Sequence, residues 1–96
     1  MDLKDAKKKL AAAKGELRAR FGITSISIFG SYSRGKQKKG SDLDLLAEFS
    51  EVPSIFTLVR AEQYLEEKLG IDVDLAYAHG LKQSFRSSIA GEAVMV

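Results

Sequence analysis

The hydrophobic and polar positions along the chain change period several times, and each period predicts an element. Within Leu3–Phe21, apolar residues recur every three or four positions with basic residues between them, which predicts an amphipathic helix. Gly22 follows where glycine commonly ends a helix, because glycine takes the left-handed conformation without steric cost. Isoleucines then alternate with serines over Ile23–Phe29, which predicts a strand that stops at Gly30.

A loop rich in glycine, serine and basic residues is predicted over residues 30–40, with one short helical turn after Ser31. A second strand follows, and its apolar face holds Leu43, Leu45, Ala47 and Phe49. Because side chains alternate along a strand, Asp42, Asp44 and Leu46 share the opposite face. The pattern therefore predicts two aspartates that project side by side.

A second helix and a third strand are predicted next. Pro53 suits the first turn of the helix, which Gly70 ends. The predicted apolar face of this helix consists of Ile55, Leu58, Val59, Leu65 and Leu69. The third strand runs over residues 71–77 and carries Asp72 and Asp74 on its polar face.

The tail, residues 81–96, has Phe85, Ile89 and Ala93 at helical spacing, and residues 94–96 extend from that predicted helix. The order helix, strand, loop, strand, helix, strand, helix predicts an α/β fold, with a small mixed sheet of three to four strands covered by helices. Strand directions do not follow from this order. With 96 residues, 45% of them hydrophobic and 29% charged, we expect one globular domain over residues 1–96.

Charge and cysteine usage exclude several classes of protein. The net charge of +2 is far below that of a dedicated nucleic-acid binder. No stretch approaches the roughly 18 apolar residues of a membrane span. The absence of cysteine removes disulfides and thiolate metal sites. We therefore expect a cytoplasmic protein with neither a membrane nor a nucleic-acid partner.

Asp42 and Asp44 lie close enough on their predicted strand to share a cation. Magnesium suits them, because it prefers oxygen ligands and is commonly held by one or two carboxylates plus substrate phosphates. Taken alone, an Asp-x-Asp at the start of a strand is more often a capping or solubility feature. The upstream Gly30-Ser31 turn favours the cation site over a capping role. A turn after a strand offers backbone N–H groups to an anion, and glycine lets a phosphate approach the backbone closely.

A third carboxylate completes this site if the third strand lies beside the second. Asp74 and Asp72 are both candidates on the same strand face. Close carboxylates repel one another, and a bound cation is the usual remedy. Arg34 could neutralise phosphate charge, but it suits a surface position or an ion pair with a nearby carboxylate equally well.

The chain resembles the minimal form of the nucleotidyltransferase superfamily typified by DNA polymerase beta in two segments, Gly30-Ser31-Tyr32-Ser33-Arg34-Gly35 and, five residues later, Ser41-Asp42-Leu43-Asp44-Leu45. The resemblance continues in Val73-Asp74-Leu75 and in Glu92-Ala93-Val94. It implies the polymerase beta-like fold, and it assigns Asp42, Asp44 and Asp74 to catalysis and to two Mg²⁺ ions. It also implies that Gly30 and Ser31 bind the terminal phosphates of ATP, while a direct role for Arg34 stays open.

The resemblance further implies a reaction, the transfer of a nucleoside monophosphate with release of pyrophosphate. Minimal members resemble the antitoxin of HEPN/MNT toxin–antitoxin pairs, which moves AMP from ATP onto a tyrosine of the partner HEPN RNase. We therefore expect a magnesium-dependent protein adenylyltransferase with a HEPN-type partner. Two alternatives stay open: an antitoxin that neutralises its partner by binding alone and, less favoured, transfer to a small molecule such as an aminoglycoside. The sequence does not decide the acceptor, the base or whether the chain forms a homo-oligomer.

Overall fold

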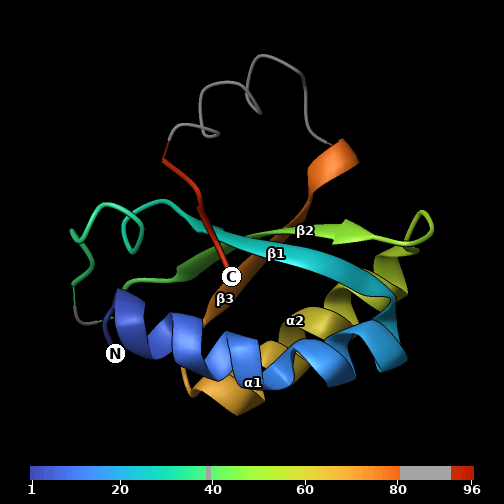
Figure 1. Cartoon of the computed structure of the whole chain (residues 1–96), viewed down its shortest axis with the longest axis horizontal. Coiled ribbons are helices and arrows are strands. Elements are labelled where there is room, and N and C mark those ends of the chain that lie inside the picture. Colours follow the sequence, from blue (N-terminus) through green and yellow to red (C-terminus); the bar gives the residue numbers. More distant parts are fainter. Residues whose placement is uncertain (39, 81–91) are drawn as a thin grey trace.

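The described part of the chain forms a two-layer α/β fold, in which two helices cover one face of a four-stranded sheet (Figure 1). The structure is a computed structural model, and it describes residues 1–38, 40–80 and 92–96. Its elements are α1 (Leu3–Phe21), β1 (Ile23–Phe29), β2 (Leu43–Phe49), α2 (Ile55–Leu69), β3 (Val73–Tyr77), the short 3-10 helix η1 (Ala78–Gly80) and β4 (Val94–Met95). The predicted α/β class and mixed sheet are confirmed.

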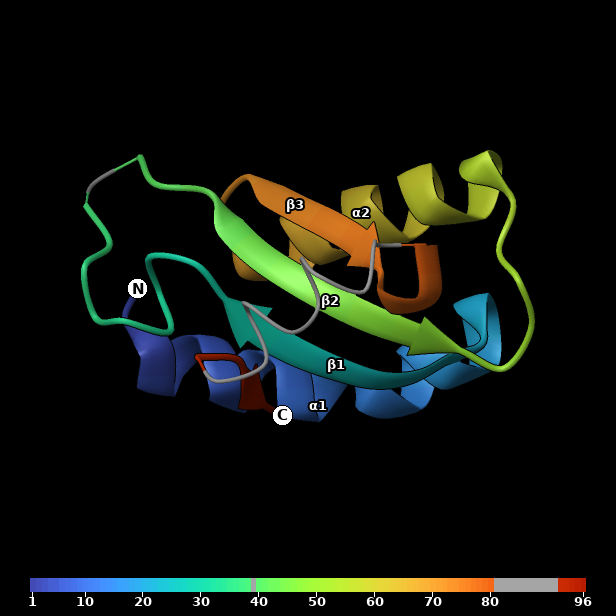
Figure 2. The ribbon, with the colours of Figure 1, turned by 90° about the horizontal axis from the view of Figure 1, so that it is seen from above.

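The strands lie in the order β3-β2-β1-β4, which the sequence pattern alone did not provide. β1 runs antiparallel to both β2 and β4, whereas β2 and β3 are parallel. Parallel neighbours need a crossover connection, and α2 supplies it. Figure 2 shows the sheet from above, with α1 and α2 on its far side. The face of the sheet opposite these helices carries the polar side chains discussed below.

The hydrophobic core lies between the sheet and the two helices. Its fully buried side chains of largest volume are Leu10, Leu17, Ile28, Leu43, Leu45 and Leu65. They come from both helices and both central strands. The apolar faces of the helices therefore pack against the apolar face of the sheet, as expected. Because strand side chains alternate, burying Leu43 and Leu45 sends Asp44 to the opposite face. No helix within the described residues is long and apolar enough to cross a bilayer.

Both ends of α1 are capped, and of the two caps only Gly22 was predicted from the sequence. The side chain of Asp2 accepts a hydrogen bond from the backbone of Asp5 at 2.8 Å, which satisfies one free amide of the first turn. Gly22 ends the helix in the left-handed conformation, with φ 72°. Its carbonyl oxygen also accepts a hydrogen bond from Ser50 at 2.8 Å, so the helix end is joined to the end of β2.

The predicted start and apolar face of α2 are partly wrong. Ser54 caps the helix by accepting from the backbone of Thr57 at 3.1 Å, so Pro53 precedes the helix instead of standing in its first turn. Ile55 and Val59 are 68% and 46% exposed. The buried stripe instead contains Ala61, Tyr64, Leu65 and Leu69, with Leu58 packed against it. This stripe steps by three and four from Leu58 and leaves the two mispredicted side chains on its flank.

Two other predicted boundaries differ from the structure. The third strand begins at Val73 and not at residue 71, although Ile71 still packs against the core. The predicted last helix lies largely in residues 81–91, outside the described residues. Its reach to Ala93 is wrong, because Ala93 is not helical and Val94–Met95 form β4. A two-residue strand has too few positions to show a period in the sequence.

Glutamates of α2 protect the outer edge of β3. The side chain of Glu66 accepts a hydrogen bond from the backbone of Val73, and that of Glu62 accepts one from the backbone of Leu75, both at 3.0 Å. An edge strand presents unpaired amides that can recruit another strand, and these carboxylates occupy two of them. The helix therefore fixes the strand that carries Asp74.

Tyr64 joins the two helices. Its hydroxyl donates a hydrogen bond to the carboxylate of Glu16 on α1, and its ring packs against Phe21. Burial raises the pKa of Tyr64 and the Glu16 carboxylate raises it further, so the phenol remains a protonated donor at neutral pH.

We predict that Tyr64→Phe lowers the free energy of unfolding by about 1–2 kcal/mol, because a hydrogen bond to a charged acceptor is lost while the ring stays. Urea unfolding followed by circular dichroism measures this change. Tyr77→Phe is the matched control, since the edge-on contact of its ring with Phe49 does not use the hydroxyl. Equal losses in the two variants would contradict the assigned role of Tyr64.

Candidate functional site

The strand register brings two of the predicted site aspartates to one level of the sheet. Phe29, the last residue of β1, pairs with Asp44, and Asp44 pairs with Asp74 on the other side. Asp44 is partly buried, whereas Asp74 is exposed. Asp42 comes just before β2 and is exposed as well. The three residues therefore lie at the end of the sheet where β1 ends and β2 and β3 begin.

Gly30 lies directly against the carboxylate of Asp44. A side-chain β-carbon at Gly30 would lie 2.2 Å from Oδ2 of Asp44, well inside contact distance. Gly30 also has φ 73°, a conformation that glycine adopts without strain. Two independent constraints thus require glycine here, and the space of its missing side chain is filled by a site carboxylate.

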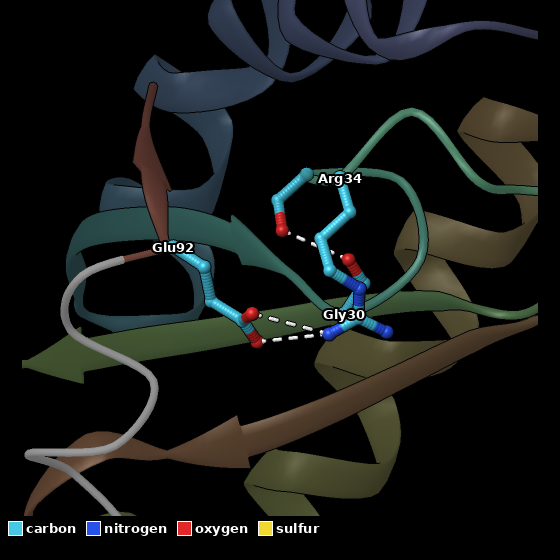
Figure 3. Close-up of polar contacts among 4 residues, drawn as sticks. Gly30, Arg34 and Glu92 are labelled. Carbon is cyan, nitrogen blue, oxygen red and sulfur yellow. Dashed lines mark hydrogen bonds and ion pairs between the residues drawn. The ribbon is translucent and has the colours of Figure 1, made fainter.

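The segment after Gly30 is a single tight turn, as predicted, and does not continue into a helix. The carbonyl oxygen of Gly30 accepts a hydrogen bond from the backbone of Arg34 at 3.3 Å. It also accepts one from the hydroxyl of Ser33 at 2.8 Å (Figure 3). Within residues 1–38, 40–80 and 92–96, the backbone amides of Ser31, Tyr32 and Ser33 donate no hydrogen bond. Free amides at the start of a turn are suited to binding an anion. The buried Tyr32 ring anchors the turn in the core.

The charges around Asp44 disfavour its ionised form. Burial raises the pKa of Asp44, and the neighbouring carboxylates of Asp74 and Asp42 raise it further. The guanidinium of Arg34 acts in the opposite direction and lowers this pKa. The three aspartates and Arg34 therefore form one electrostatically coupled group.

Arg34 makes an ion pair with Glu92, which lies just before β4. Nη1 of Arg34 lies 3.2 Å and 3.1 Å from the two carboxylate oxygens (Figure 3). Of the two roles left open for Arg34 by the sequence, a carboxylate partner is therefore observed, while phosphate binding stays a prediction. The family resemblance included Glu92 within Glu92-Ala93-Val94, but nothing in the sequence marked it as a partner of Arg34.

The aspartates have the donor chemistry for magnesium but are not gathered around one point. In the described part of the chain, no three His, Cys, Asp or Glu side chains are placed to hold a metal ion as they stand. Carboxylate oxygens are nevertheless the ligands that magnesium prefers. The raised pKa of Asp44 also indicates repulsion that a cation would relieve. The residues present therefore fit magnesium, and its binding stays a prediction.

Asp72, the alternative third carboxylate, is placed differently from Asp74. It is exposed and precedes β3, and its backbone carbonyl accepts a hydrogen bond from Leu43 at 2.9 Å. Asp74, unlike Asp72, contributes to the raised pKa of Asp44. Asp74 thus pairs with Asp44 in the sheet and Asp72 does not, while a role of Asp74 in the site stays a prediction.

Residues 10–96 match the family described as "Nucleotidyltransferase domain". The chain belongs to this family. This nucleotidyltransferase is 42% identical over all 96 residues to the protein adenylyltransferase MntA of Thermococcus cleftensis, of which it covers 97%. The family predicted from the glycine and aspartate motifs is therefore confirmed.

Solved structures share the fold of this nucleotidyltransferase. One of a "putative minimal nucleotidyltransferase" matches with a TM-score of 0.82 and 35% identity, over 98% of this chain and 95% of that one. A chain from the complex of tri-AMPylated Shewanella oneidensis HEPN toxin with MNT antitoxin matches with a TM-score of 0.71, over 97% of this chain and 70% of that one. At 17% identity the second match shows the fold alone.

We predict that Gly30→Ala weakens ATP binding in the presence of magnesium by at least about tenfold, because its methyl group displaces the Asp44 carboxylate. Gly35→Ala is the matched control. Gly35 also has positive φ, 67°, but a β-carbon there would meet nothing within 4 Å.

Both variants should lose about 1–2 kcal/mol of stability from backbone strain. Thermal unfolding separates this shared loss from the change in affinity, which isothermal titration calorimetry measures. Unchanged ATP affinity in folded Gly30→Ala would show that the contact with Asp44 is not needed for binding.

Proposed function

We propose that residues 1–96 form a single minimal protein adenylyltransferase domain that moves AMP from ATP to a hydroxyl group of a partner protein. The contact between Gly30 and the Asp44 carboxylate carries this proposal, because it joins a phosphate-binding turn to a cation-binding group. The name of the relative that is 42% identical, protein adenylyltransferase, supports the choice of a protein acceptor.

Each site residue has a role that its position allows. The free amides after Gly30 and the hydroxyl of Ser31 would bind the terminal phosphates. Asp42 and Asp44 would hold magnesium, which would supply positive charge against the phosphates. Asp74 would accept the proton of the incoming hydroxyl as its oxygen bonds to the α-phosphorus and pyrophosphate leaves. The acceptor oxygen thus ends as a phosphodiester to AMP, and the released proton resides on the carboxylate.

The proposed acceptor is a tyrosine of a HEPN-type toxin, which would make the chain an antitoxin. Support comes from the solved complex in which a HEPN toxin is described as tri-AMPylated and bound to its MNT antitoxin. Large exposed apolar side chains are a second support, since they commonly mark contact with another protein. Those of this chain at the start of α2 are Val52, Ile55, Phe56 and Val59.

The transfer reaction is tested with the purified chain, a HEPN-type toxin from the same organism as the candidate partner, ATP and magnesium. We predict that intact mass spectrometry shows AMP added to the partner. The Asp42→Asn/Asp44→Asn variant should lose about 100-fold or more of the rate, because removing two carboxylate ligands costs several kcal/mol of transition-state stabilisation. Chelation of magnesium should stop the wild-type reaction as well.

If wild type and Asp42→Asn/Asp44→Asn neutralised the partner equally well and no AMP were attached to it, the proposal would be contradicted. That result would indicate neutralisation by binding. The same variant must bind the partner as tightly as wild type for a lost rate to be assigned to chemistry. Mapping the modified residue by peptide fragmentation tests the tyrosine acceptor separately.

A second comparison distinguishes the two candidates for the third carboxylate. We predict that Asp74→Asn slows AMP transfer by about 100-fold or more, as expected for loss of a general base or ligand. Asp72→Asn should change the rate by less than about threefold, since substitutions outside the reacting groups have small effects. A larger loss in Asp72→Asn than in Asp74→Asn would reverse the assignment.

A further inference from the structure

The ion pair between Arg34 and Glu92 connects the turn after β1 with the chain that enters β4. Its two partners are 58 positions apart in the sequence. Both oxygens of the Glu92 carboxylate accept from the same nitrogen of Arg34, Nη1. Figure 3 shows the guanidinium pointing from the turn toward this carboxylate. The pair is therefore a long-range link at the edge of the site.

Backbone pairing places Glu92 beside the turn. In the antiparallel pair of β1 and β4, Ile28 lies opposite Val94. The same register continued by two residues sets Glu92 opposite Gly30. β4, which begins two residues after Glu92, thus helps to place this carboxylate beside the turn.

Stability alone does not account for this pair. The side chains of Arg34 and Glu92 are 46% and 32% exposed, and ion pairs at such positions contribute little to folding. Arg34 nevertheless belongs to the site turn, because its backbone donates a hydrogen bond to the carbonyl oxygen of Gly30, the residue that lies against the Asp44 carboxylate. Within the described residues, only Nη1 of the guanidinium nitrogens has an acceptor. A guanidinium has five N–H donors, so Nη2 and Nε still offer three to an anion.

We propose that Glu92 is a positioning residue, which holds Nη1 of Arg34 so that Nη2 and Nε are directed at the phosphates of the bound nucleotide. The proposal rests on the proposed function for the identity of that nucleotide. A planar guanidinium can bind a carboxylate through one nitrogen and a phosphate through the others at the same time. Glu92 would not touch the nucleotide itself.

Nucleotide affinity tests this role directly. Calorimetric titration with magnesium and a non-hydrolysable ATP analogue should give a Kd about 3- to 10-fold higher for Glu92→Ala than for wild type. Glu92→Gln should retain most of the affinity, because its amide oxygen still accepts from Nη1. Arg34→Ala should weaken binding at least as much as Glu92→Ala. The double variant Arg34→Ala/Glu92→Ala should match Arg34→Ala, since Glu92 acts only through the arginine.

A matched control and a kinetic readout accompany the titration. Glu67→Ala removes an exposed glutamate of α2 and should leave the Kd unchanged. In AMP transfer, Glu92→Ala should raise the KM for ATP by the same factor as the Kd, with kcat within about twofold of wild type. Thermal unfolding confirms that each variant is folded.

Three results would overturn the proposal: an unchanged or lower Kd in folded Glu92→Ala, additive losses in the double variant, or a loss in Glu92→Gln equal to that in Glu92→Ala. A wild-type chain that binds the analogue but transfers no AMP would contradict the proposed function alone, and the Kd comparison would still decide the role of Glu92. A wild-type chain that binds no analogue would overturn both.

Discussion

The register of β2 between its two neighbours is the constraint on which the site depends. Phe29 and Asp74 both pair with Asp44, one on each side. The glycine turn, which follows Phe29, and the carboxylate of Asp74 therefore flank Asp44. A slip of one position would turn Asp44 toward the helices and Leu45 toward solvent. The core that buries Leu45 therefore also aims the carboxylate. One strand register thus both buries Leu45 in the core and places the Asp44 carboxylate in the candidate site.

The same alignment places like charges beside one another. Burial raises the pKa of Asp44, and the carboxylates of Asp74 and Asp42 raise it further. Such an arrangement costs folding free energy, and sites that bind a charged ligand commonly carry this cost. Arg34 offsets part of it, while Glu92 in turn balances Arg34. At this end of the sheet, the negative aspartates therefore lie beside the positive Arg34 of the turn, which itself contacts the negative Glu92 just before β4.

Features with a local signal could be predicted from the sequence. Leu3–Phe21 and Ile23–Phe29 have the predicted bounds, because Gly22 and Gly30 mark their ends. The glycine turn and the alternation around Asp44 also placed the candidate site, and its family is confirmed. The binding roles of its residues stay predictions.

The remaining features depend on contacts between distant segments. The α2 face was misjudged because Ile55 and Val59 are apolar yet exposed, which only the packing shows. No hydrophobic periodicity in the sequence reveals the strand order, the two-residue β4 or the contact of Arg34 with Glu92. The close approach of Gly30 to Asp44 likewise requires the three-dimensional register, since the sequence shows only a glycine suited to a turn.

The pairing of β4 with β1 has a consequence for how the protein is made. A chain leaves the ribosome N-terminus first, so Arg34 and the strands β1 and β2 emerge well before residues 92–95. Glu92 reaches Arg34 only after the segment between them has emerged and its loop has closed. The guanidinium of Arg34 therefore lacks its carboxylate partner until residue 92 has emerged and β4 has paired with β1.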